Sequence, residues 1–204
     1  MGLNQFYGHI PESLLSSTAL RRLEIHGNQL SGELVIPQSS SLEYLHLYDN
    51  NLSGQLPPST LCHLLKSLID IRLNNNSFVG NIPDLNCAME RLELLTLGQN
   101  MFTGPIPNTL GESTPRLREI HLHENKLVST IPHTLFLPEN LTSVLLGNNE
   151  LTGTCIGRVY GSCSRRNNTH TLSSRQLMHA KNRDSYSRYR RRGLQSRTLI
   201  CELK

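Results

Sequence analysis

The sequence contains no tryptophan, and aromatic residues make up only 5% of its 204 residues. It has no apolar run of the roughly 18 residues that a membrane-spanning helix requires. Its opening segment, MGLNQFYGHIPES, lacks the basic and apolar regions of a secretory signal peptide. No G-x-S-x-G, P-loop, HExxH or kinase signature occurs. These absences argue against a transmembrane segment, a catalytic site and a cofactor in this chain, and they leave a core built mostly from leucine and isoleucine.

Charge is distributed unevenly along the chain. Residues 1–164 contain nine Lys and Arg against fourteen Asp and Glu, whereas residues 165–204 contain eleven against two. The second segment is poor in apolar residues and includes a dense basic run from Arg188 to Arg192, which predicts a basic disordered tail. Such a tail could bind the phosphates of a nucleic acid or an anionic lipid. We favour the simpler interpretation of a solvated or aberrantly translated tail and expect no nucleic-acid partner.

The strongest signal is internal repetition, which appears when the chain is aligned on a recurring asparagine. Seven asparagines, at positions 4, 28, 50, 76, 100, 125 and 149, lie 22 to 26 residues apart. Most copies read LxxLxLxxNxLxGxIP. One clear copy consists of Leu92, Leu95, Leu97, Asn100, Phe102, Gly104, Ile106 and Pro107. The first copy is incomplete, because it begins at Leu3 and lacks the LxxLxL half.

The two halves of the repeat predict different backbone structures. In LxL both apolar side chains fall on one face of a short strand, so parallel strands from successive copies can stack. Asparagine suits the bend after the strand, where its amide can bond backbone groups of its own and neighbouring turns. The proline of IP lacks an N–H and predicts an irregular convex connection. We expect a ladder formed by Asn28, Asn50, Asn76, Asn100, Asn125 and Asn149.

This pattern resembles the leucine-rich-repeat family, and its LxGxIP half resembles the plant-type subclass found in receptor and secreted ectodomains. The resemblance implies an α/β-type repeat solenoid. That fold is a right-handed superhelix with a concave parallel β-sheet and a convex side of irregular, 3-10 or short helical segments. We divide the chain into a truncated first repeat (1–19), six repeats (20–154), a candidate C-terminal cap (155–164) and the basic tail (165–204).

The start of the repeat array departs from this pattern. The first complete strand begins at Leu20 and has neither a preceding strand nor an N-terminal cap. We therefore interpret Met1 as an internal start, and the chain as a fragment of a longer protein or an incomplete gene model. The parent protein is expected to be extracellular or membrane-attached.

Five cysteines are present, and none forms a close CxxC pair, so neither a zinc site nor a redox motif is expected. Cys155 and Cys163 flank a short loop where the last repeat loses its GxIP, and plant-type repeats often end in a cysteine cap. The alternatives are a disulfide between these two residues and two free thiols. Cys62 and Cys87 occupy equivalent positions in adjacent repeats, which makes them candidates for a second disulfide.

The outward positions of the predicted concave strands are the candidate ligand-binding residues, because solenoids commonly bind on that surface. His26, Tyr44, His46 and Tyr48 place aromatic and imidazole rings on adjacent strands, and such rings are frequent at binding hot spots. An exposed strand also tolerates them without any ligand. The full candidate set is Arg22, Glu24, His26, Tyr44, His46, Tyr48, Asp49, Asp70, Arg72, Asn74, Glu119, His121 and His123.

Glu119, His121 and His123 alternate along one predicted strand, which raises the question of a zinc or copper site. Consecutive positions on one side of a strand lie roughly 7 Å apart. The neighbouring strands offer Thr96 and Leu145 instead of metal ligands. We therefore expect no metal ion there.

Four Asn-x-Ser/Thr triplets, beginning at Asn51, Asn75, Asn140 and Asn167, are candidate N-glycosylation sites. They fit an extracellular parent protein, although asparagine-rich repeats generate such triplets freely. A glycan on Asn75 is expected to stand on or beside the concave face.

Taken with the resemblance, these features predict a non-catalytic binding module within a receptor-like or secreted extracellular protein. The expected partner is a protein or peptide ligand on the concave face. If the parent is a receptor kinase, its kinase domain lies outside these residues. The alternative is a structural or vestigial intracellular repeat fragment that has no dedicated ligand.

Overall fold

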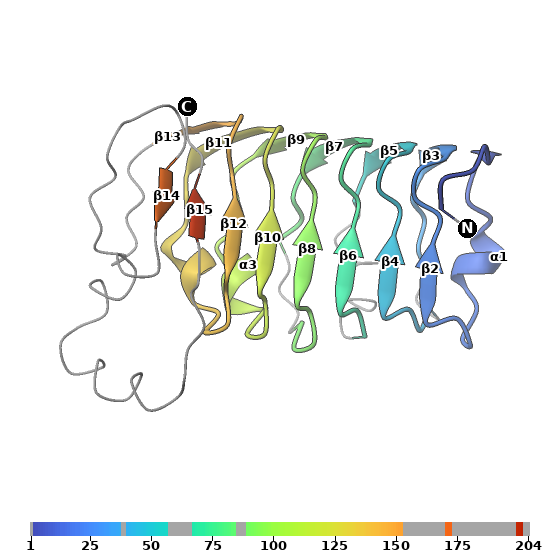
Figure 1. The fold of residues 1–204 in the computed structure, drawn as a ribbon, viewed down its shortest axis with the longest axis horizontal. Helices are drawn as coiled ribbons and strands as arrows, with labels where there is room; N and C mark the ends of the chain where they lie inside the picture. Colours follow the sequence, from blue (N-terminus) through green and yellow to red (C-terminus); the bar gives the residue numbers. More distant parts are fainter. Residues whose placement is uncertain are drawn as a thin grey trace.

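In the computed structural model, the repeats form a parallel β-solenoid with two long sheets (Figure 1). The structure describes residues 2–37, 40–56, 67–84 and 89–152, together with the backbone of residues 170–172 and 199–201. From the second repeat onward, each turn of the solenoid contributes one strand to each sheet. The repeat solenoid predicted from the LxxLxLxxN pattern is therefore confirmed.

The first sheet is the predicted concave sheet and has six parallel strands in the order β12-β10-β8-β6-β4-β2. The central residue of each strand is buried and its two neighbours point outward, as the LxL pattern predicts. The register is constant, because Leu23 lies opposite Leu45 and Leu45 lies opposite Ile71. The strands are β2 (Arg22–Glu24), β4 (Tyr44–His46), β6 (Asp70–Arg72), β8 (Leu94–Thr96), β10 (Glu119–His121) and β12 (Ser143–Leu145).

The second sheet was not anticipated from the sequence. It has seven parallel strands in the order β1-β3-β5-β7-β9-β11-β13 and runs along the upper edge in Figure 1. The strands are β1 (Tyr7–Gly8), β3 (Gln29–Glu33), β5 (Asn51–Gln55), β7 (Ser77–Asn81), β9 (Met101–Gly104), β11 (Lys126–Thr130) and β13 (Glu150–Thr152).

A period of two explains this second sheet. The apolar residue two places after a ladder asparagine, such as Leu52 or Phe78, is buried, and the residues beside it face outward. After the last ladder asparagine, Asn149, the equivalent Leu151 is half-buried. The proline of the IP pair comes only after the strand, as Pro83 follows β7, so its missing N–H does not interrupt the pairing. The irregular segment that was predicted for the convex side therefore begins only at the IP pair, after a strand that the sequence analysis did not predict.

The remaining elements are short. Among the described residues, the segments that lead from the seven-stranded sheet back to the six-stranded sheet contain two helices and a 3-10 helix. These are α1 (Glu12–Leu15), α3 (Thr109–Glu112) and η1 (His133–Phe136). Helix α3 packs against η1 so closely that a β-carbon on Gly111 would overlap the backbone carbonyl of Thr134. Glycine is required there because the two backbones touch. A separate antiparallel pair consists of β14 (His170–Leu172) and β15 (Leu199–Cys201).

Several predictions fall outside the described residues. They concern the cap at 155–164, most of the tail at 165–204, the glycosylation triplet at Asn167, and the four disulfide candidates Cys62, Cys87, Cys155 and Cys163.

Leucine and isoleucine fill the space between the two sheets, as the composition indicated. Phe78 and Phe102 are fully buried there, with ring centroids 6.2 Å apart and planes inclined by only 12°. Both phenylalanines replace the leucine of the repeat at equivalent positions. Adjacent repeats thus share one continuous apolar interior, so that each repeat depends on its neighbours for burial.

The repeating asparagines join successive turns through side-chain hydrogen bonds. The amide nitrogen Nδ2 of Asn100 donates to the carbonyl oxygens of Leu97 and Gly98 in its own turn, both at 3.1 Å, and to Leu73 in the preceding turn at 3.0 Å. Its Oδ1 accepts the backbone N–H of Phe78 at 3.0 Å. Asn125 repeats this arrangement one turn later. Each ladder asparagine therefore satisfies backbone groups at the bend where the chain leaves one sheet for the other.

We predict that Asn100→Ala lowers the free energy of unfolding by about 3 kcal/mol or more. Buried carbonyl and amide groups would lose their partners, and each such loss costs about 1–3 kcal/mol. Urea unfolding monitored by circular dichroism measures the change in the free energy of unfolding. Asn51→Ala is the matched control, because Asn51 is an exposed asparagine on β5. Equal stability of the two variants would contradict a structural role for the ladder.

Candidate ligand-binding face

The constant register of the six-stranded sheet arranges its outward side chains in rows. We call the surface formed by these rows the concave face. The first row is Arg22, Tyr44, Asp70, Leu94, Glu119 and Ser143. The second is Glu24, His46, Arg72, Thr96, His121 and Leu145. The candidate residues of β2, β4, β6 and β10 thus share one surface.

A further line of residues lies where these strands end and the chain bends toward the second sheet. His26, Tyr48, Asn74 and His123 each lie two residues after the end of their strand. From the third repeat onward, the residue immediately before each ladder asparagine has a left-handed backbone. These residues are Asp49, Asn75, Gln99, Glu124 and Asn148, with φ between 52° and 56°. We call this line the rim of the concave face.

The N-terminal part of the concave face contains a network of ionisable side chains centred on His46. Its Nε2 lies 3.0 Å from Asp70 Oδ2, and its Nδ1 lies 3.6 Å from Glu24 Oε1. Arg22 contacts Glu24 at 3.1 Å, and Arg72 contacts Asp70 at 2.9 Å. The angles at His46 Nε2 are not those of a hydrogen bond, so we treat its contact with Asp70 as electrostatic. The network links three adjacent strands and balances charge within the face.

Asp70 responds most clearly to this environment, because its side chain is only 13% exposed. Burial is the largest influence and would raise the pKa of Asp70, but the contacts with His46 and Arg72 together outweigh it. The pKa of Asp70 therefore lies below its ordinary value. Reciprocally, the hydrogen bond with Asp70 raises the pKa of Arg72.

The predicted aromatic patch is made of contacting pairs. The rings of His26 and Tyr48 stack with centroids 4.3 Å apart and planes inclined by 9°. Tyr44 meets His46 edge-on at 6.5 Å, and the Arg22 guanidinium lies 4.0 Å from the centre of the Tyr44 ring. Contacts of both kinds contribute about 0.5–1.5 kcal/mol each and reduce the freedom of the rings. The two tyrosines are therefore held in place by their neighbours.

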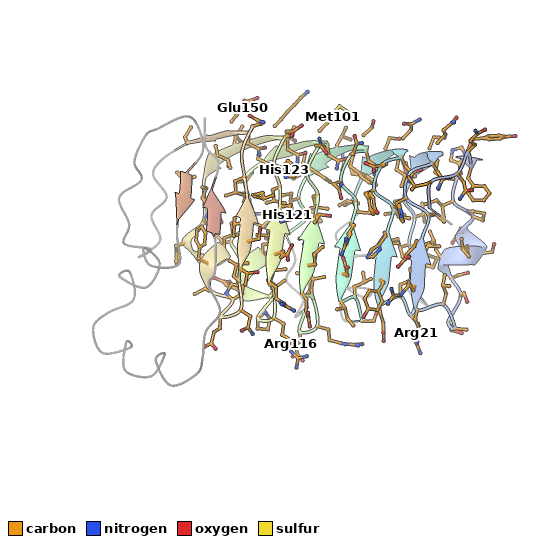
Figure 2. All side chains as sticks on the ribbon, in the orientation of Figure 1. Arg21, Met101, Arg116, His121, His123 and Glu150 are labelled. Atoms are coloured by element: carbon orange, nitrogen blue, oxygen red, sulfur yellow. The ribbon has the colours of Figure 1, made fainter. Side chains whose placement is uncertain are left out.

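The C-terminal part of the face contains the pair of histidines on and after β10, both labelled in Figure 2. His121 Nε2 lies 3.1 Å from the hydroxyl of Ser143 and 3.7 Å from Glu119 Oε2. Burial is the main cause that lowers the pKa of His121, and the charge of Glu119 acts against it. His121 and His123 meet edge to face, with ring centroids 6.3 Å apart.

No metal centre is formed by these residues. Throughout the described part of the chain, no three His, Cys, Asp or Glu side chains are grouped closely enough to hold a metal ion. Likewise, none of the described helices is long and apolar enough to cross a membrane.

Sequence reasoning missed two features of this face. Gly98 leaves room for the His123 ring, which would overlap a β-carbon at position 98. Thr96 lies on the outward side of β8 but is only 7% exposed, and its hydroxyl donates to Asn74 Oδ1 at 3.0 Å. The short side chains of Thr96 and Gly98 were the available signal, because longer side chains in neighbouring turns can cover a short one.

Comparison with known proteins places this fold among plant receptor repeats. The family model described as Leucine Rich Repeat matches residues 41–64. Pollen receptor-like kinase 2 of Arabidopsis thaliana is 36% identical over 120 residues, which is 55% of this chain and 17% of that protein. The chain thus spans about a sixth of the length of that relative.

Two solved structures extend the likeness to three dimensions. The plant peptide hormone receptor RGFR1 in complex with RGF2 matches with a TM-score of 0.67 and 33% identity, over 73% of this chain and 24% of that one. A pollen receptor kinase 3 structure matches with a TM-score of 0.62 and 31% identity, over 71% of this chain and 69% of that one. The second match covers more than two thirds of the related chain.

We predict that Asp70→Asn destabilises the protein at neutral pH by about 1–3 kcal/mol, because it removes the charged partner of His46 and Arg72. The pKa of Asp70 is depressed in the folded protein, so its contribution to stability is present above the unfolded value of about 4 and is lost as pH falls through the folded value. The stability difference from wild type should be present at neutral pH and shrink below about pH 4.

Denaturant unfolding at each pH measures this difference. Glu43→Gln is the control, because the ion pair between Glu43 and Arg91 is longer, at 3.4 Å, and more exposed. A difference between wild type and Asp70→Asn that persists unchanged below pH 3 would contradict the role given to the Asp70 charge.

Proposed function

Because the chain belongs to the plant leucine-rich-repeat family, related to receptor-like proteins and receptor-kinase ectodomains, we propose that it is a non-catalytic module that binds a protein or peptide ligand on its concave face. The parent protein is then an extracellular receptor-like or secreted protein of which this chain is a part. A kinase domain, if the parent has one, lies outside these residues.

The observation that carries this proposal is the ordered aromatic surface formed by Tyr44 and His46 on β4 and by His26 and Tyr48 just after β2 and β4. Tyr44 and Tyr48 are half-buried, and each ring is held by a neighbour, Tyr44 by Arg22 and Tyr48 by His26. Rings that are already ordered lose little conformational entropy when a ligand covers them, and tyrosine is enriched at hot spots for that reason. The likeness to RGFR1, whose structure is a complex with RGF2, supports a peptide ligand.

The balance of charge within this part of the face also supports a ligand that binds through the two tyrosines. Arg22 and Arg72 each contact a carboxylate of the chain itself, Glu24 and Asp70 respectively. Their charges are largely compensated before any ligand arrives. A ligand that covers Tyr44 and Tyr48 therefore gains mainly from apolar and aromatic contact, and we expect its affinity to depend weakly on salt.

We predict that peptides selected on this chain from a random display library bind through the two tyrosines. The library is screened against the unglycosylated chain, and dissociation constants are measured by fluorescence anisotropy. Tyr44→Ala combined with Tyr48→Ala should weaken binding at least tenfold, which is roughly 1.4 kcal/mol.

Tyr7→Ala is the matched control, because Tyr7 is 84% exposed and lies on β1 of the other sheet. Circular dichroism establishes that all variants remain folded. A failure to enrich any peptide, or enrichment of peptides that are indifferent to Tyr44 and Tyr48, would leave the structural or vestigial alternative. Binding that collapses with added salt and requires residues 165–204 would instead support the basic tail as the interaction site.

A further inference from the structure

The structure places the three described Asn-x-Ser/Thr triplets in different surroundings. Asn51, Asn75 and Asn140 are all exposed. Asn51 is the first residue of β5 and pairs with Ser31 of β3 in the seven-stranded sheet. Asn140 lies in the loop between η1 and β12, before the concave strand begins. Asn75 alone of the three lies on the rim of the concave face, immediately after Asn74.

Asn75 is joined directly to the repeat that contains the aromatic surface. Its Nδ2 donates a hydrogen bond of 2.8 Å to Oδ1 of Asp49 in the preceding turn. Asp49 follows Tyr48, whose ring stacks on His26. The backbone of Asn75 is left-handed, with φ of 52°, a conformation that asparagine adopts more readily than most residues. The Asn75 amide is therefore only one side chain away from the proposed ligand-binding rings.

From this geometry we propose that an N-linked glycan on Asn75 controls access to the concave face. The inference rests on the proposed function, because it concerns a ligand on the same surface. In the reaction, Asn75 Nδ2 forms a bond to C1 of an oligosaccharide, and the bond from C1 to the oxygen of a lipid pyrophosphate donor breaks. Nδ2 loses one proton, the lipid pyrophosphate leaves, and no group is oxidised or reduced.

The modified side chain can keep its contact with the protein. An unmodified asparagine amide has two hydrogens on Nδ2, and glycosylation replaces one of them. The other hydrogen can still donate to Asp49 Oδ1, which would hold the first sugar at the rim. Adjacent strands are separated by about 4.8 Å, so a glycan held there overhangs the turns that carry Tyr48 and Asp49. It obstructs a ligand by its bulk, without changing the fold.

The other two described triplets do not have this effect. The side chain of Asn51 points away from the seven-stranded sheet, and Asn140 lies at the opposite end of the concave strands from the rim. Thr142 of that triplet is tied to the loop by a hydrogen bond of 2.9 Å to the Arg118 carbonyl oxygen. Glycans at these two positions leave the aromatic surface open.

The test uses the full chain secreted from plant cells, with glycan occupancy mapped by mass spectrometry of glycopeptides. The probe is a display-selected peptide that binds unglycosylated protein and loses affinity on replacement of Tyr44 and Tyr48. We expect Asn75 to be occupied, and the peptide to bind the occupied protein at least tenfold more weakly than the Ser77→Ala variant. Ser77→Ala abolishes the triplet but keeps Asn75 and its contact with Asp49, whereas Ser53→Ala, the matched control at Asn51, should not change affinity.

Three outcomes separate this inference from the proposed function. An unoccupied Asn75 overturns the inference and leaves the proposed function standing. Equal affinity for the occupied protein and the Ser77→Ala variant does the same. If no selected peptide depends on Tyr44 and Tyr48, the proposed function fails and the inference fails with it.

Discussion

The bend between the two sheets is the constraint on which the rest of the structure depends. At each bend a ladder asparagine donates to carbonyl groups of two successive turns and accepts a backbone N–H, as Asn100 does with Leu73, Leu97 and Phe78. A side chain that satisfies two turns at once forces them into one register. Both sheets inherit that register, because one sheet ends and the other begins within a few residues of the asparagine.

Because the register is fixed, equivalent positions of successive repeats lie side by side and form the rows of the concave face. Residues about 24 positions apart become neighbours, so His46 can contact Glu24 and Asp70 on the strands at either side. The resulting ion network neutralises most of its own charge and holds Tyr44 through Arg22, whereas Tyr48 is held by His26. In this arrangement the polar residues keep the face ordered, and we propose that the rings of Tyr44 and Tyr48 contact the ligand. The rim follows from the same geometry, since the left-handed residue before each ladder asparagine must face away from the core.

Much of the fold could be predicted from residue spacing. The concave sheet was predictable because LxL has the period of a strand and recurs in every complete repeat. The second sheet was not, because its strands offer at most one buried residue each. In β5 and β7 that residue, Leu52 or Phe78, is followed two places later by a glycine that is typical of a turn. Its strands form only when neighbouring turns supply their hydrogen-bond partners. That information is absent from any one repeat.

By itself, the sequence determined the repeat, the interior and the side of each strand that faces outward, because these depend on local period and apolar content. Only the tertiary structure decided which outward residues touch. Tyr48 stacks on His26, His123 covers Gly98, and Asn75 bonds to Asp49, each across a turn of more than 20 residues. Such contacts depend on side-chain direction and on which residue types the constant register places beside one another. The repeat pattern predicts which residues lie on the concave face, and the packing of successive turns determines which of them are in contact.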